Sequence, residues 1–146
     1  MRALIHVHLT LRFDESRPDL AVIALPERVR GQLVLPGAPR QGPRPPFSYT
    51  WFNVVWPSYG TSKIHPRLDA ILTEAVEVVR SAGGSHTNPS ELSVTVESIS
   101  DSVSLRIEPA LCLLLAEAHV TLYVEWSKQS SASDFWEPDE THDLDV

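Results

Sequence analysis

The first residues of the chain alternate between apolar and polar side chains. In residues 3–13 every odd position is apolar, and the even positions from 6 to 12 are His6, His8, Thr10 and Arg12. A period of two residues is typical of a β-strand with one buried and one uncovered face. The chain must therefore build a sheet that is covered on one side, and the rest of the sequence has to supply the cover.

Most of the cover is predicted to come from residues 66–82, a segment that starts at Pro66 and ends before two glycines. Apolar residues recur there at spacings of three and four, which places them on one stripe of an α-helix. Glu74 and Glu77 lie outside this stripe, and we interpret them as solvated charges rather than as an acid–base pair. The stripe consists of Leu68, Ile71, Leu72, Ala75, Val76 and Val79.

The strand period of two residues and the helix spacing of three and four residues also predict the order of the other elements. We expect a strand at 3–13, a short helix at 19–30, a strand at 47–56, the helix at 66–82, a β-hairpin of strands 92–97 and 103–107, a helix at 109–118 and a strand at 120–126. The order is β-α-β-α-β-β-α-β. It predicts one α+β domain over residues 1–127, with a single mixed or antiparallel sheet of about five strands and helices on one face.

Some of these segments carry further expectations. The strand at 47–56 has apolar residues on both faces and should be central or covered on both faces, and the helix at 109–118 is apolar nearly all round and should be buried. The only cysteine, Cys112, lies in that helix, so we expect a buried thiol in a reducing compartment. No signal-peptide pattern and no membrane-spanning apolar run occur, which predicts a cytoplasmic protein without a membrane partner.

The predicted sheet leaves one face uncovered. Its polar side chains are interpreted as a wet surface or a docking surface for a partner. The strand pattern assigns to this face His6, His8, Thr10, Arg12, Ser93, Thr95, Glu97, Ser104, Arg106, Thr121, Tyr123 and Glu125.

Charge is distributed unevenly along the chain. The net charge is -7, of which residues 127–146 contribute -5 with six acids and one lysine. We therefore separate an acidic C-terminal tail, residues 128–146, from the domain, and predict that it meets a basic partner or docks on Arg28, Arg30, Arg40 and Arg44 of its own domain. The predicted partner-binding residues are Asp134, Phe135, Trp136, Glu137, Asp139, Glu140, Asp143 and Asp145.

Residues 36–46 hold five prolines and two arginines. Such a segment cannot form regular helix or sheet, and its prolines favour an extended, partly stiff conformation. We interpret it as a long surface connection, or alternatively as a recognition segment or the inner partner of the acidic tail.

Sequence motifs for catalysis and cofactors are missing from the chain. No nucleophile elbow or glycine-rich phosphate loop occurs, so we predict a protein that is not an enzyme and has no cofactor and no catalytic residue. His6 and His8 share one strand face, where Glu97, His119 or Glu125 could join them around a metal ion, but exposed strand histidines are common and we assign no metal site. The acidic net charge argues against a nucleic acid partner.

The element order resembles a widespread bacterial family of small α+β domains of unknown function, over about residues 3–126. The resemblance includes the segment Tyr49-Thr50-Trp51-Phe52 and the run from Leu111 to Ala118 before the strand at 120–124. In that family the last helix reads like Leu-Leu-x-x-Leu-Ala-Glu. Members look like the immunity proteins of toxin systems, so the resemblance implies binding rather than catalysis and names no active-site residue.

Two functions are compatible with these observations. The favoured one is a protein-binding domain, most concretely a bacterial immunity protein that neutralises a basic toxin domain, because acidic side chains accelerate association with a basic cleft. The alternative is a small-molecule or metal-binding module that uses the polar sheet face around His6 and His8. The sequence makes no prediction of the oligomeric state.

Overall fold

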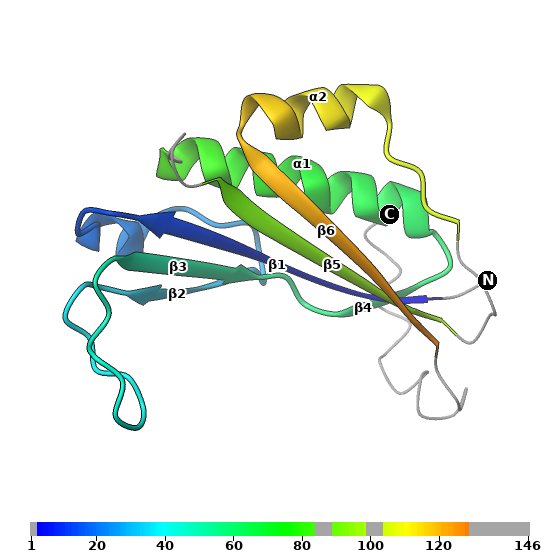
Figure 1. Cartoon of the computed structure of the whole chain (residues 1–146). Helices are drawn as coiled ribbons and strands as arrows, with labels where there is room; N and C mark the ends of the chain where they lie inside the picture. The colour runs from blue at the N-terminus through cyan, green and yellow to red at the C-terminus, as the bar shows by residue number, and fades with distance from the viewer. Residues whose placement is uncertain (1–2, 84–88, 99–103, 129–146) are drawn as a thin grey trace.

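The protein forms one β-sheet with its helices above a single face (Figure 1). The computed structural model describes residues 3–83, 89–98 and 104–128. In chain order these residues form β1 (Ala3–Phe13), a 3₁₀-helix (Pro18–Val22), β2 (Arg30–Val34), β3 (Thr50–Val55), β4 (Tyr59–Thr61), α1 (Ile64–Ala82), β5 (Ser90–Ser98), α2 (Pro109–Glu117) and β6 (Val120–Lys128).

The sheet has six strands in the order β2-β3-β1-β5-β6, and β4 pairs with residues 3–5 of β1. β1 lies at the centre, where residues 8–13 pair with β3 and residues 3–10 pair with β5. All pairs are antiparallel except β5 with β6, which is parallel. The predicted α+β class with a single sheet is confirmed. The sheet is mixed, it has six strands rather than about five, and the order of elements differs from the predicted one.

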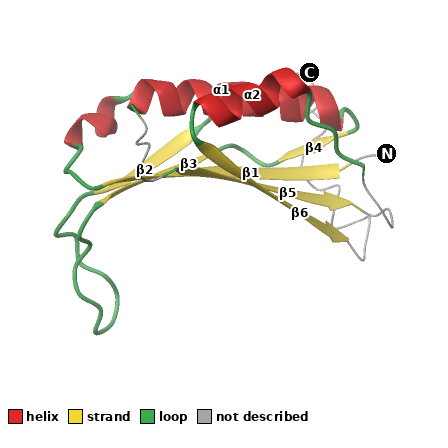
Figure 2. Cartoon of the chain, turned by 45° about the horizontal axis from the view of Figure 1, so that its top comes forward, coloured by secondary structure: helices red, strands yellow, loops and turns green. Residues whose placement is uncertain are grey.

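The alternation in β1 separates a dry face from an open face. The odd residues from Ala3 to Phe13 are at most 2% exposed, while the even residues from His6 to Arg12 are half-buried or exposed. Both helices lie on the dry face (Figure 2). The six predicted stripe residues of α1 are all buried there, and the helix ends at Gly83, whose φ of 68° suits glycine. This part of the prediction is confirmed.

The strand predicted at 47–56 is β3, which is shorter than predicted, and its expected central position is confirmed because β2 and β1 flank it. The hairpin predicted from residues 92–97 and 103–107 is wrong, because residues 104–108 form no strand and β5 pairs in parallel with β6. Parallel neighbours need a crossover, and residues 104–118 provide it. Leu105 and Ile107 alternate as in a strand, but they pack on the core from outside the sheet.

The helix predicted at 19–30 is reduced to one 3₁₀ turn, Pro18–Val22, and β2 begins at Arg30. Pro26 interrupts the segment, since proline cannot donate the helical hydrogen bond. Gly31 then lets β2 approach β3 closely, because a Cβ at this position would lie 2.9 Å from the ring of Phe52. A strand beside Phe52 therefore replaces the second half of the predicted helix.

The prediction that the helix at 109–118 is buried all round is wrong. In α2 only Leu115 is buried, and Leu113 and the Cys112 thiol are exposed. The helix packs on α1 and on β6 at the edge of the sheet, so one side of it has neighbours and the other has none among the described residues. An apolar composition therefore does not mean that every side of α2 is covered.

Burial of the α1 stripe can be tested by substitution. Leu72 is 0% exposed, so Leu72→Ala should lower the free energy of unfolding by about 2–5 kcal/mol through lost burial and a residual cavity. Val22→Ala is the control, because Val22 is 87% exposed and its truncation should change stability by less than about 0.5 kcal/mol. Urea denaturation measures both variants, and equal midpoints for Leu72→Ala and wild type would contradict the packing of α1.

Candidate functional site

The open face of the sheet carries most of the residues predicted for it. Strand pairing places His6 beside Thr95 and His8 beside Ser93, and on the next strand Glu125 lies beside Thr95 and Tyr123 beside Ser93. The residues of the predicted exposed face that lie here are His6, His8, Thr10, Arg12, Ser93, Thr95, Glu97, Thr121, Tyr123 and Glu125.

Arg106 and Ser104 do not belong to this face, because the predicted second hairpin strand does not form. The backbone N–H of Arg106 donates to Nε2 of His65 at the start of α1, over 3.1 Å. Its guanidinium pairs with Glu108, also at 3.1 Å. The prediction for Arg106 is therefore corrected: it lies in the crossover beside α1.

His6 is held by two side chains on the open face. Its Nδ1 lies 2.6 Å from the Ser58 hydroxyl, and its Nε2 lies 3.1 Å from a Glu97 carboxylate oxygen. In the neutral ring with a proton on Nε2, the imidazole donates to Glu97 and accepts from Ser58. Glu97 thus joins His6 as expected, whereas Glu125 lies two strands away and His119 lies at the other end of β5.

This arrangement gives little support to a metal site. Among the described residues no group of three or more His, Cys, Asp or Glu side chains is placed to hold a metal ion. Both ring nitrogens of His6 already have hydrogen-bond partners, and a metal would have to displace one of them.

The largest hollow described lies at the other end of the open face, between β2, β3 and the loop that joins them. It has a volume of about 850 Å³. Figure 2 shows this loop projecting on the side of the sheet opposite to the helices. We call it the basic groove, because its lining includes Arg40 and Arg44 and no acidic residue. Its walls also include Phe47, Tyr49 and Trp51.

Aromatic rings hold two guanidinium groups in this region: Arg40 lines the basic groove, and Arg12 lines a neighbouring hollow together with Trp51 and Glu91. The guanidinium carbon of Arg12 lies 3.7 Å from the ring centre of Tyr49, and that of Arg40 lies 4.2 Å from the ring centre of Phe47. The rings of Tyr49 and Trp51 also contact each other, with centres 5.5 Å apart. Cation–π contacts restrict these arginines to fixed positions, which lowers the entropy that they lose when a ligand binds.

Three N–H donors around the groove have no acceptor among the residues that the structure describes. They are Nε of Arg12, Nε of Arg40 and the indole Nε1 of Trp51, each covered from solvent. A covered donor without an acceptor costs roughly 1–3 kcal/mol. Because these donors are covered, an acceptor of a ligand could reach them only after the surrounding side chains moved.

A buried threonine fixes the strand that carries the aromatic pair. The Thr50 hydroxyl donates to the carbonyl of Glu15 over 2.7 Å and accepts from the backbone N–H of Arg17 over 3.2 Å. Thr50 has no exposed surface and lies between Tyr49 and Trp51 in the chain. The turn after β1 and the start of β3 are thus tied together next to the groove.

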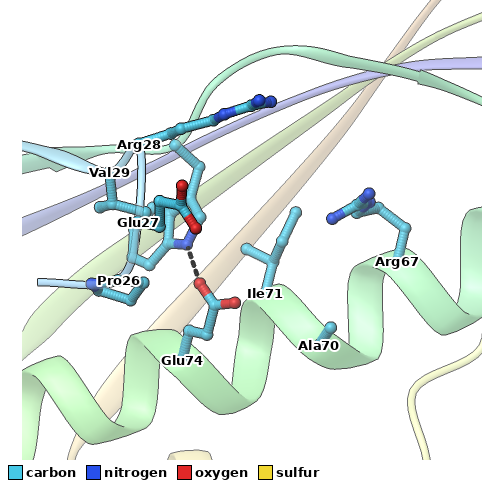
Figure 3. Close-up of a pocket in the computed structure, with 9 residues that line it drawn as sticks. Pro26, Glu27, Arg28, Val29, Arg67, Ala70, Ile71 and Glu74 are labelled. Atoms are coloured by element: carbon cyan, nitrogen blue, oxygen red, sulfur yellow. Dashed lines mark hydrogen bonds between the residues drawn. The ribbon is translucent and has the colours of Figure 1, made fainter. Parts of the chain in front are cut away.

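A second pocket lies on the helix side, between α1 and residues 26–29 (Figure 3). It has a volume of about 250 Å³, smaller than most small-molecule sites. Arg28 and Arg67 line it together with Glu27 and Glu74, so the formal charges cancel. The indole of Trp56 donates to Glu74 over 2.9 Å. Because its positive and negative charges cancel, this pocket indicates a ligand class less clearly than the basic groove does.

The four arginines expected to receive the acidic tail do not form one patch. Arg28 lines the helix-side pocket, Arg30 lies on the open face beside Val55, and Arg40 and Arg44 line the basic groove. The predicted partner-binding residues, from Asp134 to Asp145, lie outside the described residues.

Sequence reasoning missed the residues that form the basic groove as a group. β1 brings Arg12 to Tyr49 and Trp51, and the loop brings Arg40 to Phe47. A signal was present, because Phe47, Tyr49 and Trp51 recur at a spacing of two and so share one face of an extended segment. The pairing partner of that segment was not readable from the sequence.

Comparison with known proteins finds no match to a protein-family model, to a curated protein or to a solved structure. The resemblance to a bacterial family of small α+β domains therefore stays a prediction from the order of elements. None of the helices in the described part of the chain is long and apolar enough to cross a membrane.

The chain of Ser58, His6 and Glu97 has the order of a nucleophile, a base and an orienting carboxylate. The three residues line neither the basic groove nor the helix-side pocket, nor the hollows near Thr10 and Leu25. We therefore expect no covalent adduct at Ser58 after incubation with a fluorophosphonate, measured by intact-protein mass spectrometry. An adduct that forms in wild type and disappears in both Ser58→Ala and His6→Ala would contradict this expectation.

Proposed function

We propose that the protein is a non-enzymatic protein-binding domain, and that its basic groove receives a protein segment with acidic and apolar side chains. The observation that carries the proposal is the charge of the groove. In a chain with a net charge of -7, the lining of the groove contains two arginines and no carboxylate. Such a local reversal of charge selects for a negatively charged partner.

The groups in the groove match carboxylates in several ways. A guanidinium presents a planar fork of N–H donors that binds a carboxylate through two parallel hydrogen bonds. Arg12 and Arg40 are held against aromatic rings, and with Trp51 they carry donors that find no acceptor among the described residues. Carboxylates of a bound segment would pair with the guanidinium groups that line the groove.

The walls of the groove favour a peptide over a purely polar anion. Leu35, Ala38 and Pro39 line it together with the aromatic rings, so apolar side chains of a ligand would find contacts beside the arginines. The loop is braced by two backbone hydrogen bonds between residues 37–38 and Phe47, at 2.8 Å and 3.0 Å. A braced loop with mixed walls supports binding of an extended segment with little rearrangement.

A nucleic acid is the less favourable partner for the same groove. Nucleic acid affinity rests on neutralising many phosphates, and the acidic chain repels a polyanion at long range. A protein segment with a few carboxylates requires only the two or three arginines that the groove provides.

An immunity protein that neutralises a basic toxin domain is the more specific role that the sequence suggests. In that role the acidic tail, residues 128–146, would meet the toxin, and the groove would be a second contact with an acidic or neutral part of it. This specific role rests on the charge of the tail and on the family resemblance alone.

Binding of a defined acidic peptide tests the proposal. A fluorescein-labelled synthetic peptide that copies residues 134–146 carries six acids and two aromatic residues, and a matched peptide has Asn and Gln in place of the acids. We expect the acidic peptide to bind the full chain, and the double variant Arg40→Gln/Arg44→Gln to weaken binding at least tenfold, since a charged hydrogen bond contributes about 1.5–3 kcal/mol. Fluorescence anisotropy measures both affinities.

The control is Arg80→Gln, which removes one positive charge from the exposed surface of α1, on the face opposite to the groove. It should leave the affinity for the peptide within about twofold of wild type, because surface charges at this distance are screened by salt. Equal weakening by Arg80→Gln and by the groove variant would contradict a specific site. Tighter binding of a single-stranded oligonucleotide than of the peptide would contradict the class of partner.

A further inference from the structure

β6 is the outermost strand of the sheet and carries exposed apolar side chains on both of its faces. It is nine residues long, and β5 is its only neighbouring strand in the described part of the chain. Val124 and Trp126 are each 44% exposed and Tyr123 is 50% exposed. A long apolar edge strand is an open template for another strand, and proteins normally cover, charge or shorten such an edge.

The pairing of β6 with β5 determines which backbone groups face outward. The N–H of Ser90 donates to the carbonyl of His119, and Ser90 is in register with Val120. In a parallel ladder this geometry directs the N–H and C=O groups of odd residues of β6 toward β5. Those of the even residues point away from the sheet, and they belong to Val120, Leu122, Val124, Trp126 and Lys128.

Cover from α2 is limited to the first half of β6. Val120 and Leu122 are half-buried and pack against the core, as do Leu111 and Leu114 of α2. Val124 and Trp126 point to the same side of the sheet two and four residues further on, where their side chains are exposed. The second half of the strand thus has apolar side chains on the helix side without the cover that the first half receives.

We propose that the occupant of this edge is a second copy of the chain, with the two β6 strands antiparallel around a two-fold axis at Val124. In this register Val124 lies opposite Val124 of the second copy, and Leu122 lies opposite Trp126 of the second copy. Each residue whose backbone N–H and C=O point outward then lies opposite another such residue. The two can exchange both hydrogen bonds, as in the hydrogen-bonded pairs of an antiparallel ladder. The two sheets become one continuous sheet.

Two features select this register, and a third follows from the symmetry. It pairs all nine residues of β6, from Val120 opposite Lys128 of the second copy to the reverse pair at the other end. It places Glu125 opposite Tyr123 of the second copy, whereas a shift by two residues toward the C-terminus would place Glu125 opposite Glu125. The helices of both copies also remain on the same face, because an axis through a residue pair is perpendicular to the sheet.

The two-fold axis also supplies the missing cover. The axis places the first half of β6 in one copy, which α2 covers, beside the uncovered second half of β6 in the other copy. Trp126 then packs against Leu122 of the second copy, which lies under that copy's α2. A strand from a different protein would satisfy the outward backbone groups, but this exchange of covered and uncovered halves follows only from two identical strands.

Sedimentation velocity on the full chain tests the proposal. At tens of micromolar we expect a species of twice the chain mass of 16.3 kDa. Val124→Lys places two lysines opposite each other at the axis and should raise the dissociation constant of the dimer at least tenfold, and Val124→Glu should do the same. An equimolar mixture of the two variants should restore the dimer, because the lysine of one copy then meets the glutamate of the other.

Val55→Lys is the matched control, because Val55 is 50% exposed but lies on β3, away from the edge. It should leave the dimer intact, and circular dichroism should show that all variants retain the wild-type fold. A wild-type chain that is monomeric at all concentrations would overturn the proposal. A dimer that Val124→Lys does not weaken, or two variants that do not recombine, would also overturn it.

Discussion

The structure depends on the cover that α1 provides for one face of the sheet. The odd side chains of β1 reach almost zero exposure where the stripe of α1 packs on the sheet, and the alternate side chains of β5 are equally buried in the same core. Burial of this apolar surface is the main favourable term in folding a domain of this size. It also fixes which side chains remain outside, because a strand that is dry on one face directs every second residue to the other.

The candidate functions follow from what this cover leaves open. On the uncovered face, β1 and β3 place Arg12 beside Trp51, and the loop adds the aromatic and basic residues of the basic groove. On the helix side, α1 lies over the central strands and α2 reaches only the first half of β6, so the edge strand keeps exposed apolar residues. The groove and the edge are separate surfaces. The groove is distinguished by its positive charge, and the edge by apolar residues that the helices leave exposed.

Local patterns predicted what local physics determines. The period of two in β1 and the stripe of α1 were readable because each residue's environment repeats along one element. Pairing between distant segments was not readable: the alternation of Leu105 and Ile107 suggested a hairpin, and the apolar run around Cys112 suggested a buried helix. The neighbourhood of the basic groove depends on the register that brings Arg12 to Trp51. The sequence shows these residues but does not show that they lie side by side.

The central claim is that the uncovered face, and not the helix side, recognises an acidic segment. The four tryptophans give indole N–H signals in a ¹⁵N–¹H correlation spectrum, and their assignment by substitution makes two of them direct reporters. Trp51 lines the basic groove with an indole N–H that has no acceptor in the described residues, whereas the Trp56 indole is bound to Glu74 beneath the helices. On titration with the acidic peptide, the Trp51 signal should move in a saturable manner while the Trp56 signal stays in place. A saturable shift of Trp56 with an unmoved Trp51 would contradict the account.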